Sequence, residues 1–498
     1  MALLSGCDGG STEDDDLTQD AKPTDTVPRC TPDTVNACTC DAGLESQRIC
    51  DETTGEWGEC LCESADAQPE GINSGAIITE PDDESAFLWD GDVLRTFELL
   101  IKEEDLAILD ADPRAEVYVP GTLVFEGQQY GPVGVRYKGS YGAYMSPCTS
   151  VTRESMDFSK TGKCCLKVSF NWNNPEGRFF GLKKLQFHSM IHDPSFLRER
   201  LAYSLFREMG IPASRVVHAR VIINGKFEGL FALVEQIDGR FTRSRFVEGG
   251  KGNLYKEVWP MHESEDIYLA ALKTNEDESP SVKAMLDFKA AIEEGPESMK
   301  AWIDKELMLR YLAVDRVIIN DDGIMHWWCM GRGGIGGNPG PYANHNYYWY
   351  MASDESQIWL IPWDLDACMK PDNMVQVYSE WWQKTEECSC QPNPQSYYTG
   401  PQFPPSCDPL IGEWGEWLTD FEQVRDAFIA GPFATAKVEA TLDTWAAQIK
   451  DSVIEQYNAK IPTWDEGDQL LSLEEWREEI ATLKSLLRDM VANGGYAY

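Results

Sequence analysis

The sequence predicts an α+β fold in which a β-rich part containing one helix precedes a part built mainly of helices. Short runs of β-branched and aromatic residues, separated by Gly, Asn and Pro, dominate up to residue 235, as is typical of strands and turns. Beyond that point, apolar residues recur with helical spacing over long stretches. With 498 residues the chain exceeds the size at which a single core stops growing, so we expect more than one folded unit.

Strand signals in the first part are apolar alternation and flanking turn residues. They predict strands in six segments: Leu94–Ile101, Gly121–Phe125, GPVGVRYKGS at 131–140, KCCLKVSF at 163–170, Arg215–Ile223 and Phe227–Val234. The last two are joined by Asn224-Gly225, the residue pair most typical of a tight hairpin. A short helix is expected over Glu103–Asp110.

The inserted helix is predicted over Pro194–Met209. Asp193 would cap its N-terminus, and Gly210 with Pro212 would end it. Periodicity in the second part predicts five more helices: Ser281–Glu294, Met299–Ile319, Trp417–Ala430, Thr435–Ala459 and Leu473–Ala492. No apolar run of the sequence is long enough to cross a bilayer.

The first residues match the cleavage pattern of a bacterial lipoprotein, because Leu4, Ser5 and Gly6 precede Cys7. Cys7 would carry the lipid that forms the only membrane attachment, placing the protein outside the cytoplasm on the outer membrane or cell surface. A full signal also has a basic start and a longer apolar run, so we expect residues 1–28 to hold a truncated signal and an acidic tether. Chance similarity in a cytoplasmic protein is the alternative.

Cysteine usage also favours an exported protein. Of the 15 cysteines, the 14 other than Cys7 form an even number, as expected for disulfides. Six lie within residues 29–63, which hold few aliphatic residues, so we expect a disulfide-linked knob there and a polar linker over 64–85. A zinc site is the alternative, although the segment has no His and a CxC spacing. The other eight cysteines are expected to pin loops of the main domain.

The charge balance limits the choice of partner. Lys and Arg number 43 against 83 Asp and Glu, which gives a formal net charge of −40. Such a surface repels nucleic acids and anionic membranes within the range that salt leaves unscreened. Composition therefore excludes a nucleic-acid partner and favours a basic protein.

Acidic and amide side chains gather between residues 315 and 366. This stretch contains NDDG at 320–323, HNYYWY at 345–350 and LIPWDLD at 360–366. The motifs place these side chains at the ends of short aromatic strands. Phosphoryl transfer requires a metal held by oxygen ligands and a carboxylate that orients the acceptor hydroxyl. The stretch therefore indicates a site for a magnesium-bound phosphate.

A β-rich part with one helix followed by a helical part is also the layout of a protein kinase, and the sequence resembles the CotH family of kinase-like proteins. The resemblance rests on RYKGS at 136–140, KCCLKVSF at 163–170, DPSFLRERLAYSLFREMGIP at 193–212, VIINGKFEGLFALVEQIDGRF at 221–241, GNLYK at 252–256 and the three motifs above. It implies a two-lobed kinase-like domain over residues 86–480, with an N-lobe over 86–235, a C-lobe over 240–480, and a helix end and tail over 481–498.

The resemblance implies roles for the acidic residues. Asp364 matches the metal-binding Asp, with Asp366 as a candidate second ligand, and Asn346 is the candidate amide ligand. Asp322 matches the catalytic Asp that accepts or steers the proton of a hydroxyl substrate. Its distance in sequence to Asn346 is far longer than in ordinary kinases. Capping of a turn or helix is the alternative for either Asp, and Asp321 takes the role of Asp322 if the register is shifted by one.

Residues that would face the phosphates of ATP come from the β-rich part. Gly139 and Ser140, at the end of the strand that carries Lys138, occupy the position of a kinase glycine loop, although a hairpin turn explains them equally well. The run GRGGIGGNPG at 331–340 lacks the ending of a phosphate-binding loop, so we expect a loop over the site.

The resemblance implies that a lysine contacts the phosphates of ATP. Lys163 is the first candidate for this role, and Lys167 and Lys138 are the alternatives. A solvated strand lysine is the alternative for each. Glu199 on the inserted helix would pair with the phosphate-facing lysine, although the neighbouring arginines can also satisfy it. Glu235 would begin the hinge whose backbone meets adenine.

These features predict an ATP- and Mg²⁺-dependent kinase that phosphorylates Ser or Thr of an extracytoplasmic protein, with a basic protein as the preferred substrate. Hydrolase and zinc-protease motifs such as HExxH are absent from the sequence. Because ATP is scarce outside the cytoplasm, two alternatives stay open. One is a kinase-fold transferase of another group, AMP or an amino acid, and the other is a non-catalytic surface adhesin or binding module.

Overall fold

The computed structural model describes residues 77–139, 148, 162–191, 193–276, 280–329, 339–370, 381–391, 401–461 and 470–494, and the backbone of 35–39 and 45–49. The chain divides into two compact units, residues 1–72 and 73–498. The first unit contains β1 (Val35–Thr39) and β2 (Glu45–Ile49), which pair antiparallel. Cys7 and the disulfides expected within 29–63 lie outside the described residues.

Seven strands of the second unit close into a barrel: β3 (Arg95–Ile101), β4 (Val119–Phe125), β5 (Gln128–Tyr137), β6 (Leu166–Ser169), β7 (Lys184–His188), β8 (Val216–Ile223) and β9 (Lys226–Val234). Their order is β3-β4-β5-β6-β7-β9-β8, and the parallel pair β3 and β8 closes the barrel. Successive side chains of a strand point to opposite faces. One set, including Phe97, Val135 and Phe187, fills the interior with apolar groups.

The hairpin between β8 and β9 is the one that the sequence predicts. Asn224 and Gly225 form its turn with φ angles of 51° and 80°, as a type I′ turn requires. The Asn224 side chain also accepts a hydrogen bond from the Ile101 amide at 2.8 Å and donates one to the Ile101 carbonyl at 2.7 Å. The turn is therefore tied to the end of β3.

The inserted helix is shorter than predicted. It is α2 (Arg198–Glu208), and it begins only after Phe196, whose φ of 63° cannot belong to an α-helix. Asp193 nevertheless accepts a hydrogen bond from the Arg198 amide at 2.7 Å and pairs with the Arg198 guanidinium at 2.6 Å. Gly210, with a φ of 78°, follows the end of the helix as predicted.

Ten further α-helices lie in the described part: α1 (Glu103–Ala111), α3 (Gly239–Arg245), α4 (Glu265–Ala271), α5 (Lys283–Glu294), α6 (Pro296–Met299), α7 (Lys305–Val317), α8 (Pro409–Gly415), α9 (Leu418–Ala430), α10 (Thr435–Asn458) and α11 (Leu473–Ala492). The helix predicted over 299–319 begins only at Lys305, because Asp304 caps α7 by accepting from the Leu307 amide at 3.0 Å, and Met299 is the last residue of α6. None of the described helices is both long and apolar enough to span a membrane.

Two small sheets lie within the helical part. β10 (Asn253–Lys256), β13 (Tyr347–Met351) and β14 (Ile358–Pro362) form an antiparallel sheet, and β11 (Trp328–Cys329) pairs with β12 (Tyr342–Ala343). The aromatic strand β13 is completely buried in the centre of its sheet. The sheet thereby fixes both the NYYWY and the WDLD motifs relative to the helices.

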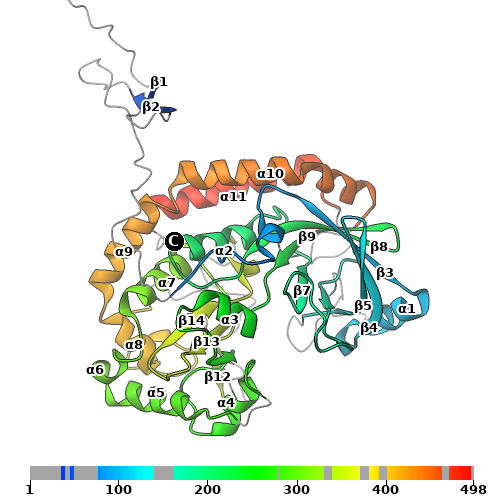
Figure 1. The fold of residues 1–498 in the computed structure, drawn as a ribbon. Coiled ribbons are helices and arrows are strands. Elements are labelled where there is room, and N and C mark those ends of the chain that lie inside the picture. The colour runs from blue at the N-terminus through cyan, green and yellow to red at the C-terminus, as the bar shows by residue number, and fades with distance from the viewer. Residues whose placement is uncertain are drawn as a thin grey trace, which may run out of the picture. The chain divides into compact units, whose positions relative to one another are not determined.

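Buried apolar side chains form two clusters. One fills the barrel, and the other joins the helices, the small sheet, α2 and one face of β8 and β9. Helix α10 contacts both parts: Ser452 accepts a hydrogen bond from Arg220 of β8 at 2.8 Å, and Gln456 accepts from the Leu230 amide of β9 at 2.9 Å. Figure 1 shows α10 and α11 running along the helical part toward the barrel strands. The long helix therefore braces the barrel.

The eight cysteines of the second unit do not all pair. Three disulfides form, Cys148–Cys164, Cys329–Cys390 and Cys388–Cys407. Cys165 and Cys368 are free thiols that contact Ser189 and Asn320. The prediction that all eight cysteines pin loops is therefore wrong for these two.

Candidate active site

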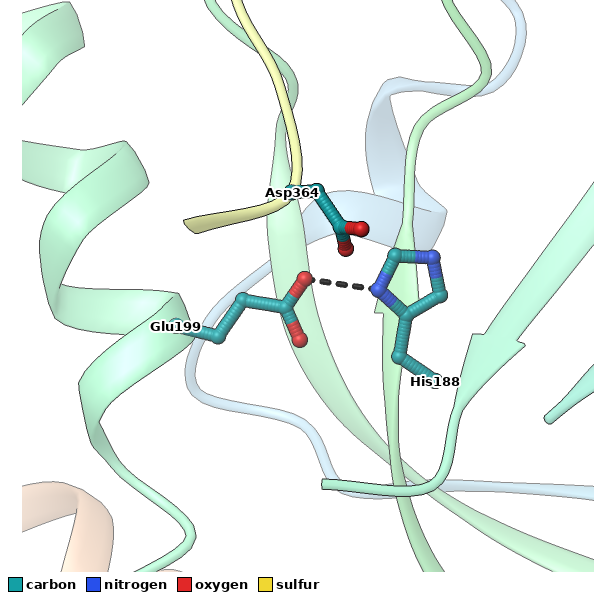
Figure 2. A group of neighbouring side chains, drawn as sticks. All are labelled: His188, Glu199 and Asp364. Carbon is teal, nitrogen blue, oxygen red and sulfur yellow. Dashed lines mark hydrogen bonds and ion pairs between the residues drawn. The ribbon is translucent and has the colours of Figure 1, made fainter. Parts of the chain in front are cut away.

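Three polar side chains from separate elements meet between the barrel and the helical part (Figure 2). His188 is the last residue of β7, Glu199 lies in the first turn of α2, and Asp364 follows β14. One ligand atom from each, a ring nitrogen or a carboxylate oxygen, lies within 4.8 Å of the other two. His188 and Glu199 are almost completely buried.

The orientation of Asp364 depends on α2. Its backbone is left-handed, with a φ of 54°, and its amide donates to the Tyr203 hydroxyl at 3.0 Å. Tyr203 is four residues after Glu199, so the two side chains extend from the same face of the helix. One face of α2 thus carries Glu199 and holds the backbone of Asp364.

A chain of hydrogen bonds runs from Lys138 through His188 to Glu199. Lys138 Nζ lies 2.6 Å from His188 Nε2, and His188 Nδ1 lies 2.6 Å from Glu199 Oε1. An ammonium group only donates, so Nε2 accepts and we infer that Nδ1 carries the proton donated to Glu199. Burial, together with the charge of Lys138, lowers the pKa of His188 to about 3, which keeps the ring neutral.

The carboxylates of this group fit a divalent cation. Glu199 Oε2 is buried with no hydrogen-bond partner in the described part of the chain. Burial and the neighbouring Asp364 raise the pKa of Glu199, and burial and Asp366 raise that of Asp364. Burial and the charge of Glu199 also raise the pKa of Asp366 to about 6. A cation would relieve this repulsion, and oxygen donors of this type suit Mg²⁺.

Asp322 lies in a second polar group, in the loop after α7. Its Oδ1 lies 2.6 Å from His345 Nε2 and accepts from Trp328 Nε1 at 3.2 Å, while its Oδ2 accepts from Asn346 Nδ2 at 2.7 Å. Burial opposes ionisation, but His345 outweighs it and lowers the pKa of Asp322. Burial alone would lower the pKa of His345, but the Asp322 carboxylate raises this pKa to about 9.

The two groups are connected through Asp366. The carboxyl group of Asp366 interacts electrostatically with Glu199 and His188 on one side and with Asp322 on the other. Asp322, Asp364 and Asp366, which the sequence places in two distant motifs, therefore contribute to one polar region.

Asn346 has a different environment from the one expected of a metal ligand. Its side-chain amide donates to both the carboxylate and the carbonyl of Asp322, at 2.7 Å and 3.0 Å. Its φ of 64° turns the chain at the start of β13. The structure gives Asn346 a positioning role toward Asp322, and ligation by its amide oxygen stays a prediction.

The lysine that reaches the carboxylates is Lys138 and not Lys163. Lys163 is 2% exposed, and its ammonium donates to the Ser189 carbonyl at 2.8 Å and to the Leu230 carbonyl. The resemblance made Lys163 the first candidate, but its side chain points toward backbone carbonyls of the barrel and away from the carboxylates. Lys167 points to the outer face of the barrel, beside Lys138.

The glycine loop is only partly described. The Gly139 amide donates to Glu116 Oε1 at 3.3 Å, and the φ of Gly139 is 95°, a conformation that glycine adopts most readily. Ser140 and most of the glycine-rich run at 331–340 lie outside the described residues.

Glu235 is held by hydrogen bonds and ion pairs within the protein. Its amide donates to the Arg215 carbonyl at 3.0 Å, and its carbonyl accepts from Ser214 at 3.0 Å. Its carboxylate pairs with Arg215 at 2.6 Å and Arg245 at 2.5 Å, and is 1% exposed. The two arginines outweigh burial and lower the pKa of Glu235. Contact between the backbone of this hinge segment and adenine stays a prediction.

Sequence reasoning missed the two histidines that hold these carboxylates. No role in the site was predicted for His188 or His345 from the sequence. His345 carried a signal, because it immediately precedes Asn346 in HNYYWY. His188 carried a weaker one: it alternates along a strand with Gln186 and Lys184, so it shares their face.

The described part of the chain is thus a mixed α+β protein with a seven-stranded sheet, eleven helices and two connected acidic groups. The family profile described as CotH kinase protein matches residues 135–489, so the chain belongs to the CotH family. It is 22% identical over 298 residues to the inner spore coat protein H of Bacillus subtilis strain 168, an alignment that covers 55% of this chain and 68% of that protein. All the residues of both acidic groups lie within the matched range.

Removal of the Glu235 carboxylate should destabilise the protein strongly. We expect Glu235→Ala to lower the free energy of unfolding by about 3–5 kcal/mol, because it leaves buried arginines unpaired. Chemical denaturation would measure the change. Glu416→Ala, which removes an ion pair with Lys384 in which both side chains are more than half exposed, should cost less than about 1 kcal/mol. Equal effects of the two substitutions would contradict the role of the buried cluster.

The ion pair of His345 should make stability depend on pH. Its folded pKa of about 9 lies above the ordinary 6.5, so the pair contributes fully below pH 6.5 and is lost as the pH rises through 9. We expect the difference in unfolding free energy between the wild type and His345→Gln to shrink over this range. A difference that stays constant from pH 6.5 to 9 would show that the pair with Asp322 does not form.

Proposed function

We propose that the chain is a two-lobed, protein-kinase-like phosphotransferase that uses ATP and Mg²⁺ to phosphorylate Ser or Thr of an extracytoplasmic protein. The observation that carries this proposal is that one region contains two kinds of carboxylate. Asp322 is hydrogen-bonded and kept ionised, whereas Asp364 lies among other carboxyl groups. Membership of the CotH family supports the reaction class.

The two-lobed interpretation is supported by the two separate apolar clusters. The barrel has a core of its own, and the helices and small sheet have another. Lys138 and His188 come from barrel strands or their ends, whereas Asp322 and Asp364 come from the helical part. A site at the boundary between two lobes is the arrangement in which kinases hold a nucleotide.

Glu199, Asp364 and Asp366 are the residues that would hold Mg²⁺. When bound, the ion supplies charge neutralisation and Lewis-acid polarisation for the phosphates. His188 hydrogen-bonds the Glu199 carboxylate, and the Tyr203 hydroxyl accepts from the backbone amide of Asp364. Lys138 adds a positive charge beside them.

Asp322 would orient the acceptor hydroxyl. A carboxylate has about four acceptor positions, and three are used by His345, Trp328 and Asn346. The remaining position on Oδ2 can accept the proton of a Ser or Thr hydroxyl. The lowered pKa keeps Asp322 ionised, and its three fixed donors hold it in one orientation.

Charge and cysteine chemistry support the proposed substrate and location. A net charge of −40 attracts a basic acceptor protein over one with acidic sites. The three disulfides of the second unit are expected in an oxidising compartment, in agreement with a lipid anchor at Cys7.

Nucleotide binding should depend on magnesium and on Asp364. A ligand at about 100 times its Kd stabilises a protein by about 2.7 kcal/mol, so ATP with Mg²⁺ should raise the melting temperature measurably, and EDTA should abolish the shift. Asp364→Asn should lose it. Asp354→Asn, an exposed aspartate in the turn between β13 and β14, is the matched control and should keep it. If the wild type shows no shift at millimolar ATP and Mg²⁺, a non-catalytic binding module is the better interpretation.

Transfer should depend on Asp322. With ATP labelled on the γ-phosphate and a basic Ser-containing protein as acceptor, Asp322→Asn should reduce incorporation about 10²- to 10⁴-fold. Asp321→Asn should keep most of the activity, and the reverse pattern would move the assignment to Asp321. Incorporation of label from the α-phosphate would show transfer of AMP, which contradicts the kinase reaction.

A further inference from the structure

Two stacked aromatic rings support the carboxylate of Asp322. Trp328 Nε1 donates to Asp322 Oδ1 at 3.2 Å. The indole lies parallel to the ring of His326, with the two centroids 4.0 Å apart and an angle of 8° between the ring planes. His326 is completely buried, whereas Trp328 is partly exposed. The buried imidazole therefore supports the indole that contacts the carboxylate.

The His326 ring is held in turn by two hydrogen bonds. Its Nδ1 lies 2.6 Å from the Asp321 carbonyl oxygen, and its Nε2 lies 2.8 Å from the side-chain amide nitrogen of Gln402. A carbonyl oxygen accepts and an amide nitrogen donates, so we infer that Nδ1 carries the ring proton and Nε2 accepts. Gln402 is 1% exposed, so its buried amide fixes the ring.

A disulfide connects the two segments that flank Gln402. On one side the amide and carbonyl of Gln402 exchange hydrogen bonds with Gln391, at 2.9 Å and 2.8 Å. On the other side Gln402 forms a β-bridge with Trp328. Cys390 precedes Gln391, Cys329 follows Trp328, and these two cysteines are bonded to each other. One covalent bond thus closes the patch that contains Trp328 and Gln402.

The backbone around Trp328 depends strongly on this bond. Strand β11 has only two residues and pairs with the equally short β12, and a two-stranded pair is marginal by itself. The disulfide joins residues 61 positions apart, so it removes far more chain entropy than a short loop would. We therefore expect the position of Trp328 to change when the disulfide opens.

The Cys329–Cys390 disulfide is also accessible to solvent, unlike the disulfide of the barrel. Cys390 is exposed and Cys329 is partly exposed, whereas Cys148 and Cys164 are 3% and 4% exposed. Exposed disulfides are the ones that thiols reduce most readily. A reductant can therefore open the bond beside Trp328 while the barrel disulfide stays closed.

We propose that the Cys329–Cys390 disulfide is a redox switch that holds Trp328 against Asp322, so that a thiol reductant releases Trp328 and lowers phosphoryl transfer. His326 is a positioning residue in this switch, because it acts on Asp322 through Trp328. The effect on transfer rests on the proposed function, whereas the hold on Trp328 does not.

The reduction step balances with a dithiol as the reductant. Its first thiolate attacks one sulfur of the disulfide, and the other sulfur leaves as a thiolate that takes up a proton. The second thiolate of the reductant then attacks the mixed disulfide. Cys329 and Cys390 become thiols, and the reductant becomes a cyclic disulfide.

Fluorine NMR of the full chain labelled with fluorotryptophan tests the hold on Trp328 without ATP. The Trp328 signal is identified by its loss in Trp328→Phe. Dithiothreitol, at a concentration that leaves the Cys148–Cys164 disulfide closed, should shift or broaden this signal. Alkylation and mass spectrometry would show which cysteines have been reduced. A Trp328 signal that stays unchanged after Cys329 and Cys390 are reduced would overturn the proposal, whatever a transfer assay shows.

Transfer kinetics test the consequence for Asp322. The same reduction should lower kcat about tenfold and change KM for ATP less than about twofold, because a displaced Asp322 affects the acceptor hydroxyl and not nucleotide binding. The double variant Cys329→Ala with Cys390→Ala should show the same loss and no further response to dithiothreitol. A wild-type kcat that survives reduction of this disulfide would overturn the switch. A wild type without any transfer contradicts the proposed function instead, and the NMR measurement still decides the hold on Trp328.

Gln402→Leu tests the path through His326 while the disulfide stays closed. It removes the donor to the ring, so kcat should fall about tenfold with little change in KM for ATP, and the Trp328 signal should move as it does on reduction. Gln383→Leu, which changes an exposed glutamine in the segment that contains Cys390, is the matched control and should keep the wild-type values. If the two variants have the same kcat and the same Trp328 signal, His326 does not position Asp322 and this part of the proposal is wrong.

Discussion

The electrostatic crowding of three carboxyl groups, on the buried Glu199 and the half-buried Asp364 and Asp366, is the constraint on which the candidate site depends. Like charges withdrawn from water repel strongly and raise each other's pKa values, as occurs at all three. Neighbouring cations offset part of this cost. Lys138 reaches the group from β5 through His188, and Lys256 reaches Asp364 from β10. The barrel and the helical part must therefore stay in fixed positions relative to each other, which the bracing by α10 provides.

Two aspartates of the same region are held in opposite electrostatic environments. Asp322 is stabilised as an anion by His345, Trp328 and Asn346, so its pKa is lowered. Asp364 has like-charged neighbours, so its pKa is raised. Pairs of titratable groups whose environments push their pKa values apart usually have different chemical roles. The contrast is consistent with one carboxylate that contacts a hydroxyl proton and another that contacts a cation.

Local signals predicted the elements of this fold better than its long-range contacts. The Asn224-Gly225 turn and the end of α2 at Gly210 follow from backbone preferences of single residues, and both are confirmed. The start of α2 was predicted too early because Asp193 caps the helix from outside it, across the turn at Phe196. Closure of the barrel depends on the parallel pairing of β3 with β8, which are separated by more than 100 residues and have no local signature.

The contrast between local signals and long-range contacts also explains which residues of the candidate site the sequence predicted. Asp322, Asp364 and Glu199 were predicted because each belongs to a short motif, and the two-lobed interpretation brought them together. Lys163 was preferred over Lys138 because motif spacing does not specify which way a side chain points. Lys163 lies before β6 begins at Leu166, so strand alternation does not fix its direction, and its ammonium donates to the Ser189 and Leu230 carbonyls. The ion pairs of Glu235 with Arg215 and Arg245 could not be predicted for a related reason, because these partners meet only once β8, β9 and α3 are packed.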